Sequence, residues 1–471
     1  MKKSIIGSFV MVIMLITGLA GCAPQPAAPA DPSASPIAPG TSTPVASTTT
    51  PTPAGTDTVV DLAGLEGLQI RFLHPWTGAT LDLLYQMVDQ FNQTNEWGVH
   101  VIMVAPGSAA QVTERLNEEL ANDIASNVLV APVNQLLAID EKHQLVVDLS
   151  SYVSSTSFGM ETTLIEDYNQ VFWNEGFAEG KLFGIPAQRT ALVMAYNGSL
   201  GKELGYSGIP LTLEEFRERA CAANAIFKKD EDTTNDGLGG WIISSEAASV
   251  HNWLLSFGAD PYQEGEYDFS TPAAQLALTY LYNLKVDACA WTNRSAADAD
   301  RFAKREALVY SLWLQDLDRQ VDAMARNGSE DEWEVMAYPG EENGRLLTLG
   351  SSYAVLHKDA DSDLAAWLFM RWLAQPAQQA RLLAAMGTLP LTSHVMTYMT
   401  DYGIDHPYWL KTVSRYTRFT TPPVDADWQV IAPVLEDAAW QVWMGGISEA
   451  DIPAVLSQMD GLAVELSERY P

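Results

Sequence analysis

Cations are scarce in this 471-residue chain, because 27 lysines and arginines accompany 59 aspartates and glutamates and the net charge is −32. Binding to nucleic acid needs clustered Lys and Arg to neutralise phosphates, and a peripheral contact with an anionic membrane needs a polybasic patch. The sequence therefore argues against both kinds of partner. It says little about a small ligand, because a cleft can differ in charge from the whole surface.

Signature motifs of several enzyme classes are also missing. The sequence contains no GxSxG nucleophile elbow, no HExxH zinc motif and no Gly-rich phosphate loop. Neither a catalytic metal nor a cofactor is predicted. Counting does not exclude a pair of carboxylates at the separation that a glycoside hydrolase uses, since acidic residues are abundant. A lipid-anchored glycoside hydrolase is therefore one alternative to a binding protein.

Long apolar runs are limited to Ile5–Leu19, which follows Lys2 and Lys3. A positive head, a short apolar run and small residues before a cut site are typical of a secretory signal peptide. The sequence Leu19-Ala20-Gly21-Cys22 resembles the lipobox of bacterial lipoproteins, in which the cysteine is acylated and becomes the first residue. We expect residues 1–21 to be removed, which lowers the net charge to −34, and Cys22 to hold the protein on the extracytoplasmic face of the cell membrane. The alternative is a buried cysteine after an ordinary signal peptide.

Pro, Ala, Ser and Thr dominate residues 22–57. Such a composition cannot bury enough surface to fold, so we predict a disordered spacer, with a glycosylated stalk as the alternative. About 414 residues follow, which are too many for one hydrophobic core and suit two domains. Their apolar and aromatic content is that of a well-packed globular protein.

Two further cysteines, Cys221 and Cys289, lie in the part that we expect to be exported. An even pair outside the cytoplasm suggests a disulfide, and a closed loop of this length stabilises by roughly 4 kcal/mol in the chain-entropy estimate. The alternative is two buried free thiols. No Cys or His spacing indicates a zinc site.

Strands alternate with helices in the first part of the chain. We predict strands over 68–73, 99–104 and 127–131 and helices over 79–94, 109–122 and 134–139. This alternation favours a mostly parallel sheet covered on both faces, which binds ligands at the carboxyl ends of its strands. Trp76 and Pro132 follow two of these ends.

The later part of the chain is richer in helices. We predict helices over 213–227, 271–286, 363–373 and 452–466 and strands over 306–312 and 333–337. Thr212 stands where a residue that caps the first of these helices belongs, and Glu214 and Glu215 follow in its first turn. The sequence shows no internal repeat.

Four stretches resemble motifs of the family 1 extracellular solute-binding proteins of ABC importers, the maltose-binding-protein-like group. They are residues 70–76, 180–197, 302–313, and 350–355 followed by 387–390. The resemblance extends from residue 66 to the end of the chain. It departs from the family pattern at Arg305, where the family usually has glycine, so the local turn is in question.

The resemblance implies an α/β fold of type II, a periplasmic-binding-protein-like fold with two discontinuous lobes and a cleft between them. The crossings between lobes would fall near Asn197, Tyr338 and Leu389. The N-terminal lobe would then contain residues 58–197 and 338–388. The C-terminal lobe would contain residues 198–337 and 389–471.

Sugars present C–H faces that stack on aromatic rings and hydroxyls that pair with polar side chains. The expected ligand-binding residues are Trp76, Gln188, Arg189, Trp253, Trp313, Ser351 and Tyr353. For any one tryptophan the alternative is packing in a core, and for Arg189 it is an interlobe ion pair or a place on the surface.

The implied function is capture of a small solute, with a sugar or oligosaccharide favoured, by closure of the lobes. The protein would act as a monomer, without catalysis, and would deliver the solute to the permease subunits of an ABC transporter. A ligand sensor without transport is a further alternative that the sequence leaves open.

An acidic turn over residues 230–237 partly matches the calcium-binding loop pattern. Asp232, Thr234 and Asp236 take the first, third and fifth places, but Ile243 takes the twelfth, where glutamate is required. We favour a solvated acidic turn, and calcium binding stays open as the alternative.

Overall fold

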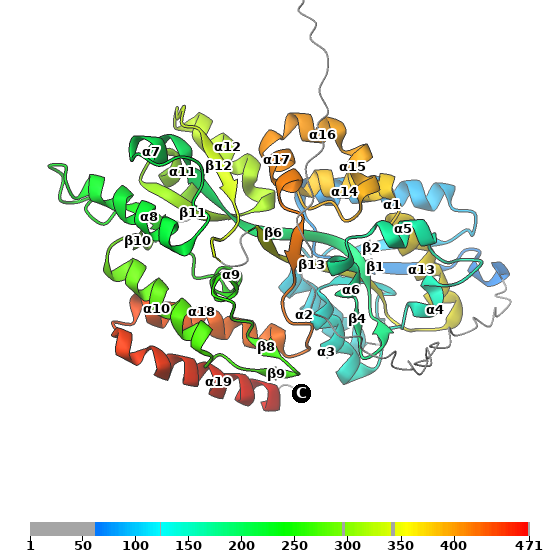
Figure 1. Ribbon diagram of the computed structural model, residues 1–471. Coiled ribbons are helices and arrows are strands. Elements are labelled where there is room, and N and C mark those ends of the chain that lie inside the picture. Colours follow the sequence, from blue (N-terminus) through cyan, green and yellow to red (C-terminus); the bar gives the residue numbers. More distant parts are fainter. Residues whose placement is uncertain (1–61, 123, 294–296, 341–343, 470–471) are drawn as a thin grey trace, which may run out of the picture. The chain divides into compact units, whose positions relative to one another are not determined.

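A computed structural model describes residues 62–122, 124–293, 297–340 and 344–469 (Figure 1). The contacts within the chain divide it into two units, Met1–Ala54 and Gly55–Pro471, and the described residues all belong to the second. The predicted signal peptide, the lipidated Cys22 and the spacer lie outside the described residues. In the part that is described, no helix is long and apolar enough to cross a membrane.

One mixed sheet of ten strands contains most of the described strands. Its members are β1 (Gln69–Leu73), β2 (His100–Val104), β3 (Val128–Ala131), β6 (Ile185–Asn197), β7 (Gly239–Ile242), β10 (Ala290–Trp291), β11 (Ala307–Trp313), β12 (Trp333–Met336), β13 (Arg345–Val355) and β14 (Arg418–Thr420). The order is β10-β7-β11-β6-β13-β3-β1-β2, with β12 paired to β6 and β14 paired to β13. Two hairpins stand apart, β4 (Phe177–Ala178) with β5 (Lys181–Leu182) and β8 (Tyr262–Gln263) with β9 (Glu266–Tyr267).

Two long strands, β6 and β13, connect two lobes of the fold. β6 pairs with β13 as far as Ala191 and with β11 from Leu192 onward. The N-terminal lobe contains β1, β2 and β3, and the C-terminal lobe contains β7, β10, β11 and β12. In Figure 1, β6 runs from the helices around β1 to those around β11. The predicted two-lobed α/β architecture is thus present.

Helices cover the sheet of the N-terminal lobe. They are α1 (Gly78–Thr94), α2 (Ala109–Ala121), α3 (Val133–His143), α4 (Ser150–Val153), α5 (Thr162–Asp167), α6 (Gln170–Asn174), α13 (Ala360–Leu373) and α14 (Pro376–Met386), preceded by the 3₁₀ helix η1 (Leu62–Leu65). The six strands and helices predicted before residue 140 are confirmed, except that α3 is longer than expected.

The remaining helices follow β6 and β13 along the chain. They are α7 (Gly198–Glu203), α8 (Leu213–Phe227), α9 (Ala247–Ser256), α10 (Pro272–Val286), α11 (Asp298–Ala303), α12 (Leu317–Arg326), α15 (Ser393–Tyr398), α16 (Thr400–Asp405), α17 (Pro407–Arg415), α18 (Trp428–Met444) and α19 (Ile452–Arg469), with the 3₁₀ helices η2 (Leu314–Asp316) and η3 (Glu449–Asp451). α8 begins as predicted, because the Thr212 hydroxyl accepts the Glu215 N–H and the Glu215 carboxylate accepts the Thr212 N–H.

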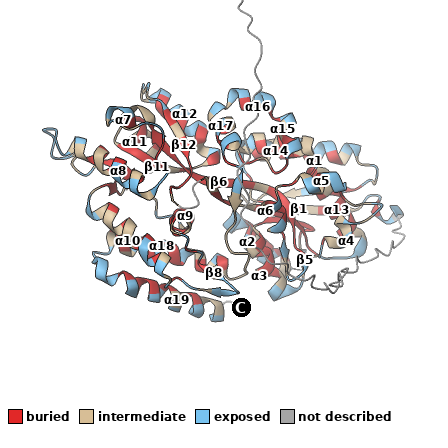
Figure 2. Ribbon diagram, viewed as in Figure 1, coloured by how far each residue is buried: buried red, intermediate tan, exposed pale blue. Residues whose placement is uncertain are grey.

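Successive residues of the central strands pack against opposite layers of the core. Phe72 of β1 belongs to one buried cluster and Leu73 to another, and Tyr310 and Val309 of β11 divide in the same way. Figure 2 shows the central strands buried between helices whose outer faces are exposed. Both lobes are therefore three-layered, with helices on each face of the sheet.

The crossings between lobes that we expect near Asn197, Tyr338 and Leu389 stay a prediction. Asn197 pairs with β12 and Tyr338 lies in the core of the C-terminal lobe. After Leu389, the residues Leu391 and Val395 share the buried cluster of β1 and α1. Leu389 donates its backbone N–H to the Arg189 carbonyl oxygen on β6 at 2.8 Å, and the exact lobe boundaries stay a prediction.

Arg305 occupies the turn where the family usually has glycine. Its backbone has a φ of 66°, in the left-handed region that glycine adopts without strain. Its guanidinium forms ion pairs with Glu203 at 2.6 Å and with Asp331 at 2.8 Å. The turn that the family pattern requires is therefore kept, and the arginine side chain attaches it to two neighbouring segments.

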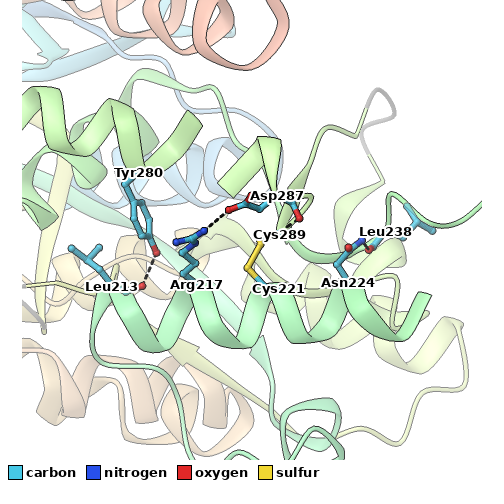
Figure 3. The surroundings of a disulfide bond; sticks show 8 residues. All are labelled: Leu213, Arg217, Cys221, Asn224, Leu238, Tyr280, Asp287 and Cys289. Atoms are coloured by element: carbon cyan, nitrogen blue, oxygen red, sulfur yellow. Dashed lines mark hydrogen bonds and ion pairs between the residues drawn. A yellow bond between two sulfur atoms is a disulfide. The ribbon is translucent and has the colours of Figure 1, made fainter. Parts of the chain in front are cut away.

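A disulfide joins Cys221 on α8 to Cys289, three residues after α10 (Figure 3). On one side of it Arg217 pairs with Asp287, and on the other the Asn224 amide donates to the Leu238 carbonyl at 2.6 Å. The two cysteines are 68 residues apart in sequence, and the bond links α8 to the segment after α10 in the C-terminal lobe. Bonds of this kind persist in oxidising compartments.

Candidate functional site

The two lobes direct the carboxyl ends of their strands toward the same crossing segment. β3 runs parallel to β6 and ends level with Pro186, because Ser352 of β13 faces both Ala131 and Pro186. β11 runs antiparallel to β6 and ends with Trp313 opposite Leu192. Six residues of strand separate these two ends, which corresponds to about 20 Å. Such a meeting of strand ends is where open α/β sheets bind ligands.

The crossing segment forms the floor between the strand ends. Gln188–Ala191 of β6 pairs with Thr348–Ser351 of β13. A Cβ on Gly350 would lie 2.0 Å from the Gln188 carbonyl oxygen and 2.7 Å from Arg189 Cδ. Only glycine permits this approach of the two strands.

A cavity of about 140 Å³ lies beside this floor. It is lined by Pro132, Val133, Asn134, Glu175, Leu349, Gly350, Pro422, Pro423, Val424 and Trp428. The lining thus combines the end of β3, the crossing strand β13, the segment after β14 and the start of α18. We call this cavity, together with the strand ends around it, the interlobe groove.

Arg189 is fully buried under the floor. Its Nε lies 2.8 Å from the Glu175 carboxylate, and its other nitrogens donate to the backbone oxygens of Gln188 and Ser351 and to the Ser352 hydroxyl. Burial raises the pKa of Glu175 despite this arginine. The predicted role of Arg189 as a polar clamp on the ligand does not agree with this placement, because its donors are occupied within the N-terminal lobe and crossing strands.

Trp253 was predicted as a ligand-stacking ring, but the structure places it in the core of the C-terminal lobe. The side chain has no exposed surface. Four aromatic rings pack around it with centroids 5.2–5.7 Å away, those of Phe216, Trp241, Tyr280 and Tyr338. The ring has no free face for a ligand, and we withdraw it from the candidate set.

Trp76 and Tyr353 lie at the N-terminal-lobe side of the groove. Their rings contact each other edge to face at 6.2 Å, and both belong to the core cluster around Phe72. Trp76 is 9% exposed and Tyr353 is fully buried. The Tyr353 hydroxyl nevertheless has no partner among the described residues. In this structure the pair packs against Phe72 of β1, and little of Trp76 is exposed to a ligand.

Trp313 lies at the C-terminal-lobe side of the groove and is only partly buried. It lies near the Glu246 carboxylate, which belongs to the residue that precedes α9. Of the three predicted tryptophans, this one keeps the most accessible ring. Gln188 and Ser351 face each other on the crossing strands, and the buried Gln188 carboxamide oxygen has no partner in the described part of the chain.

Sequence reasoning missed three carboxylates on the C-terminal-lobe side. Glu246 follows β7, Asp298 begins α11 after β10, and Asp316 ends η2 after β11. Burial raises the pKa of all three, and mutual repulsion with Glu436 adds to the pKa of Glu246. Trp76 was selected because open α/β sheets bind ligands at the carboxyl ends of their strands. The same rule applies to the segments that follow β7, β10 and β11. We call these three residues the acidic wall.

The acidic turn over residues 230–237 is held by its own hydrogen bonds. Asp232 Oδ1 accepts the backbone N–H and the hydroxyl of Thr234, and Asp230 accepts from Asp232 and Asn235. Across all described residues, no group of three or more His, Cys, Asp or Glu side chains is placed to hold a metal ion.

Comparison with known proteins identifies the family. The family described as bacterial extracellular solute-binding protein matches residues 86–401, well over half of the chain. The chain belongs to this family. The resemblance to extracellular solute-binding proteins that the sequence showed is thereby confirmed. Membership of this family implies that the protein lies outside the cytoplasm.

A relative by sequence is a binding protein of Brucella abortus (strain 2308), 21% identical over 282 residues. The match covers 59% of this chain and 66% of that protein, so the chain matches just under two thirds of its relative's length.

Solved structures of solute-binding proteins share the fold. The cyclic alpha-maltosyl-1,6-maltose binding protein of Arthrobacter globiformis has a TM-score of 0.69 at 18% identity and covers 84% of this chain and 99% of its own. The sugar-binding protein MalE of Xanthomonas citri has a TM-score of 0.69 at 19% identity, with 84% and 98% covered. UgpB of Mycobacterium tuberculosis, in complex with glycerophosphocholine, has a TM-score of 0.65 at 15% identity, with 85% and 98% covered. At these identities the likeness shows the type II periplasmic-binding-protein fold, and this solute-binding protein is α/β and two-lobed as predicted.

Proposed function

We propose that this solute-binding protein captures a small polyhydroxy solute, a sugar or a polyol, in the interlobe groove. The observation that carries the proposal is the meeting of strand ends from both lobes at one crossing segment, with the accessible ring of Trp313 beside it. A partly exposed indole suits the C–H face of a sugar, and the unpaired Gln188 oxygen suits a hydroxyl donor. Neighbours of the same fold include proteins that bind maltose-type sugars and ribitol.

The solute would be bound without being converted. A ligand that touches the crossing strands and both walls makes its full set of contacts only when the lobes are close together, so it would favour the closed state by its differential affinity. The cavity of about 140 Å³ is small, and a solute of several sugar rings would need the groove to widen. We propose that the closed, monomeric form is what a membrane permease of an ABC transporter receives.

Ligand binding is tested by calorimetry and thermal melting of the exported protein against maltotriose, cellotriose and ribitol. A solute present at 100 times its dissociation constant should raise the free energy of unfolding by about 2.7 kcal/mol. Absence of binding by every sugar and polyol tested contradicts the proposal. Release of shorter products from an oligosaccharide would favour the hydrolase alternative.

We further propose that the protein is anchored through lipid on Cys22, which lies outside the described residues. Replacing Cys22 with serine removes the thiol that would be acylated. We expect Cys22→Ser to leave the membrane fraction or to retain its signal peptide, as measured by fractionation and mass spectrometry of cell extracts. Cys221→Ser serves as a control that should stay membrane-bound. Processing and membrane attachment of Cys22→Ser like those of the parent protein would contradict the anchor.

A further inference from the structure

We infer that the solute places a hydroxyl group in the cavity of about 140 Å³, where it donates to the Glu175 carboxylate and accepts from the first turn of α3. The inference rests on the proposed function and names a residue that selects its substrate, a polyhydroxy solute without a negative charge at this point. Three features of the cavity support it, namely the free polar atoms in its lining, the charge around them and the segments that hold its walls.

Glu175 presents a carboxylate oxygen to the cavity. Its side chain is 9% exposed and forms part of the cavity lining. Arg189 donates through Nε to Glu175 Oε2 at 2.8 Å, and Oε1 accepts no hydrogen bond from any described residue. An ionised carboxylate can only accept hydrogen bonds, and its bonds are stronger than those between neutral groups. Oε1 therefore needs a donor, which the solute can supply.

The first turn of α3 lines the same cavity through Pro132, Val133 and Asn134. The backbone N–H groups of Val133 and Asn134 donate to no described residue, whereas those of the next two residues bond to the Pro132 carbonyl oxygen. Free N–H groups at the start of a helix carry a partial positive charge and attract oxygen atoms. The cavity thus combines donors from α3 with an acceptor from Glu175, and one hydroxyl group can bond to both.

A neutral group fits this cavity better than an anion does. Glu175 is the only charged residue among the described residues of the lining. Its partner Arg189 is fully buried, and the other nitrogens of the guanidinium donate to the crossing strands. A phosphate or carboxylate on the solute would accept from α3 but would also lie beside Glu175, which repels it. A hydroxyl group both donates and accepts, so it suits the two sides at once.

The segment between β14 and α18 forms an apolar wall of the cavity, which suits the C–H groups of a sugar or polyol. The β8–β9 hairpin holds this wall in place. The hydroxyls of Tyr262 and Tyr267 donate to the Asp425 carboxylate at 2.9 and 2.8 Å, and the Tyr267 ring stacks on Trp428 at 6.2 Å. A wall that is held by its own contacts does not have to be ordered when the solute binds, which favours affinity.

The test compares the exported protein with Glu175→Gln in calorimetric titrations with maltotriose, cellotriose and ribitol. Glutamine can keep its carbonyl oxygen on Arg189 Nε, and its amide N–H groups then point into the cavity, so a donor replaces the acceptor. We expect each of these solutes that binds the parent to bind the variant about tenfold or more weakly. A crystal structure of the parent with that solute should show a hydroxyl oxygen about 2.5–3.0 Å from Glu175 Oε1. Inorganic phosphate should not displace the solute.

Two further variants separate the contact with the solute from an effect on the fold. Glu175→Gln leaves Arg189 buried without its counter-charge, which lowers stability, so thermal melting accompanies each titration. Arg189→Met with Glu175→Leu removes both charges together with the acceptor, and should also bind about tenfold or more weakly than the parent. Glu179→Gln removes a carboxylate from the exposed turn between β4 and β5 and should bind and melt like the parent.

The outcomes separate the role of Glu175 from the proposed function. If a sugar or polyol binds the parent and the folded variants equally well, or if phosphate displaces it, the inference is wrong and the proposed function stands. The same holds if the bound solute has no hydroxyl group within about 3.5 Å of Glu175. If neither variant folds, the crystal structure of the parent complex decides alone. If no sugar or polyol binds the parent, both the inference and the proposed function are wrong.

Discussion

Replacing Trp253 with alanine should destabilise the protein by about 3–5 kcal/mol. The indole is fully buried, and four aromatic rings surround it with centroids 5.2–5.7 Å away. Truncation therefore removes the free energy gained by burying the indole away from water. It also leaves a cavity, because the rigid rings around it cannot move in to fill the space. The measurement is chemical denaturation with disulfide intact, compared with the parent protein at the same pH.

Trp313→Ala is the matched control, because it removes the same side chain from the edge of the groove. We expect a loss of about 2 kcal/mol in binding free energy for a sugar that binds the parent, since one aromatic anchor is lost. Its stability should change much less than that of Trp253→Ala, because Trp313 is only partly buried. If Trp313→Ala instead loses stability like Trp253→Ala and keeps its affinity, the ring belongs to the core and the groove lies elsewhere.

Replacing Arg189 with methionine should destabilise the protein by about 3–5 kcal/mol. The change leaves the Glu175 carboxylate buried without its ion-pair partner, and the backbone oxygen of Ser351 and the hydroxyl of Ser352 lose their donors. A buried carboxylate without its partner lowers the free energy of unfolding by far more than the intact ion pair contributes to it. Unfolding in denaturant measures the loss.

The pH dependence of the stability of Arg189→Met follows from the direction in which the pKa of Glu175 is shifted. Burial already raises the pKa of Glu175 in the parent, and removal of the guanidinium raises it further. An acid whose pKa is higher in the folded than in the unfolded state costs stability when it ionises. The destabilisation should therefore be full at pH values above the folded pKa of Glu175 and shrink as the pH falls from there toward the pKa of the unfolded state.

A double variant tests the cause. Arg189→Met with Glu175→Leu removes both charges, and we expect it to recover most of the stability that the single variant loses, because apolar replacements of a buried pair are often neutral. If the double variant is as unstable as Arg189→Met, the loss comes from the contacts with Ser351 and Ser352 or from packing, and the ion pair is not responsible.

Much of the architecture was accessible from local patterns. The predicted helix over 213–227 agrees with α8 at both ends, because the Thr212 capping box and the apolar stripe act within a few residues of each other. The alternation of strands and helices before residue 140 predicted the order of elements for the same reason. The disulfide was predicted by counting cysteines. Apart from Cys22, the sequence has only Cys221 and Cys289, so each can bond only with the other.

The candidate site was harder to predict, because exposure of a side chain depends on segments far away in sequence. Trp253 and Trp313 both lie in strongly apolar surroundings, yet rings from α8, β7, α10 and the segment after β12 cover the first and leave the second accessible. Arg189 was expected to face the solute. Its guanidinium instead meets Glu175, fourteen residues earlier in sequence, and Ser351, which is distant in sequence.

The sequence by itself determined the strands and helices before residue 140, the fold class, the family and the pair of bonded cysteines, because each depends on short-range periodicity or on motifs that survive as residue patterns. Only the tertiary structure decided which tryptophan is accessible, how Arg189 is neutralised and that strand ends of both lobes meet at one crossing segment. The reason is physical. Burial and electrostatic environment are set by which surfaces the fold brings together, and strand ends from separate βα units become neighbours only when the sheet forms.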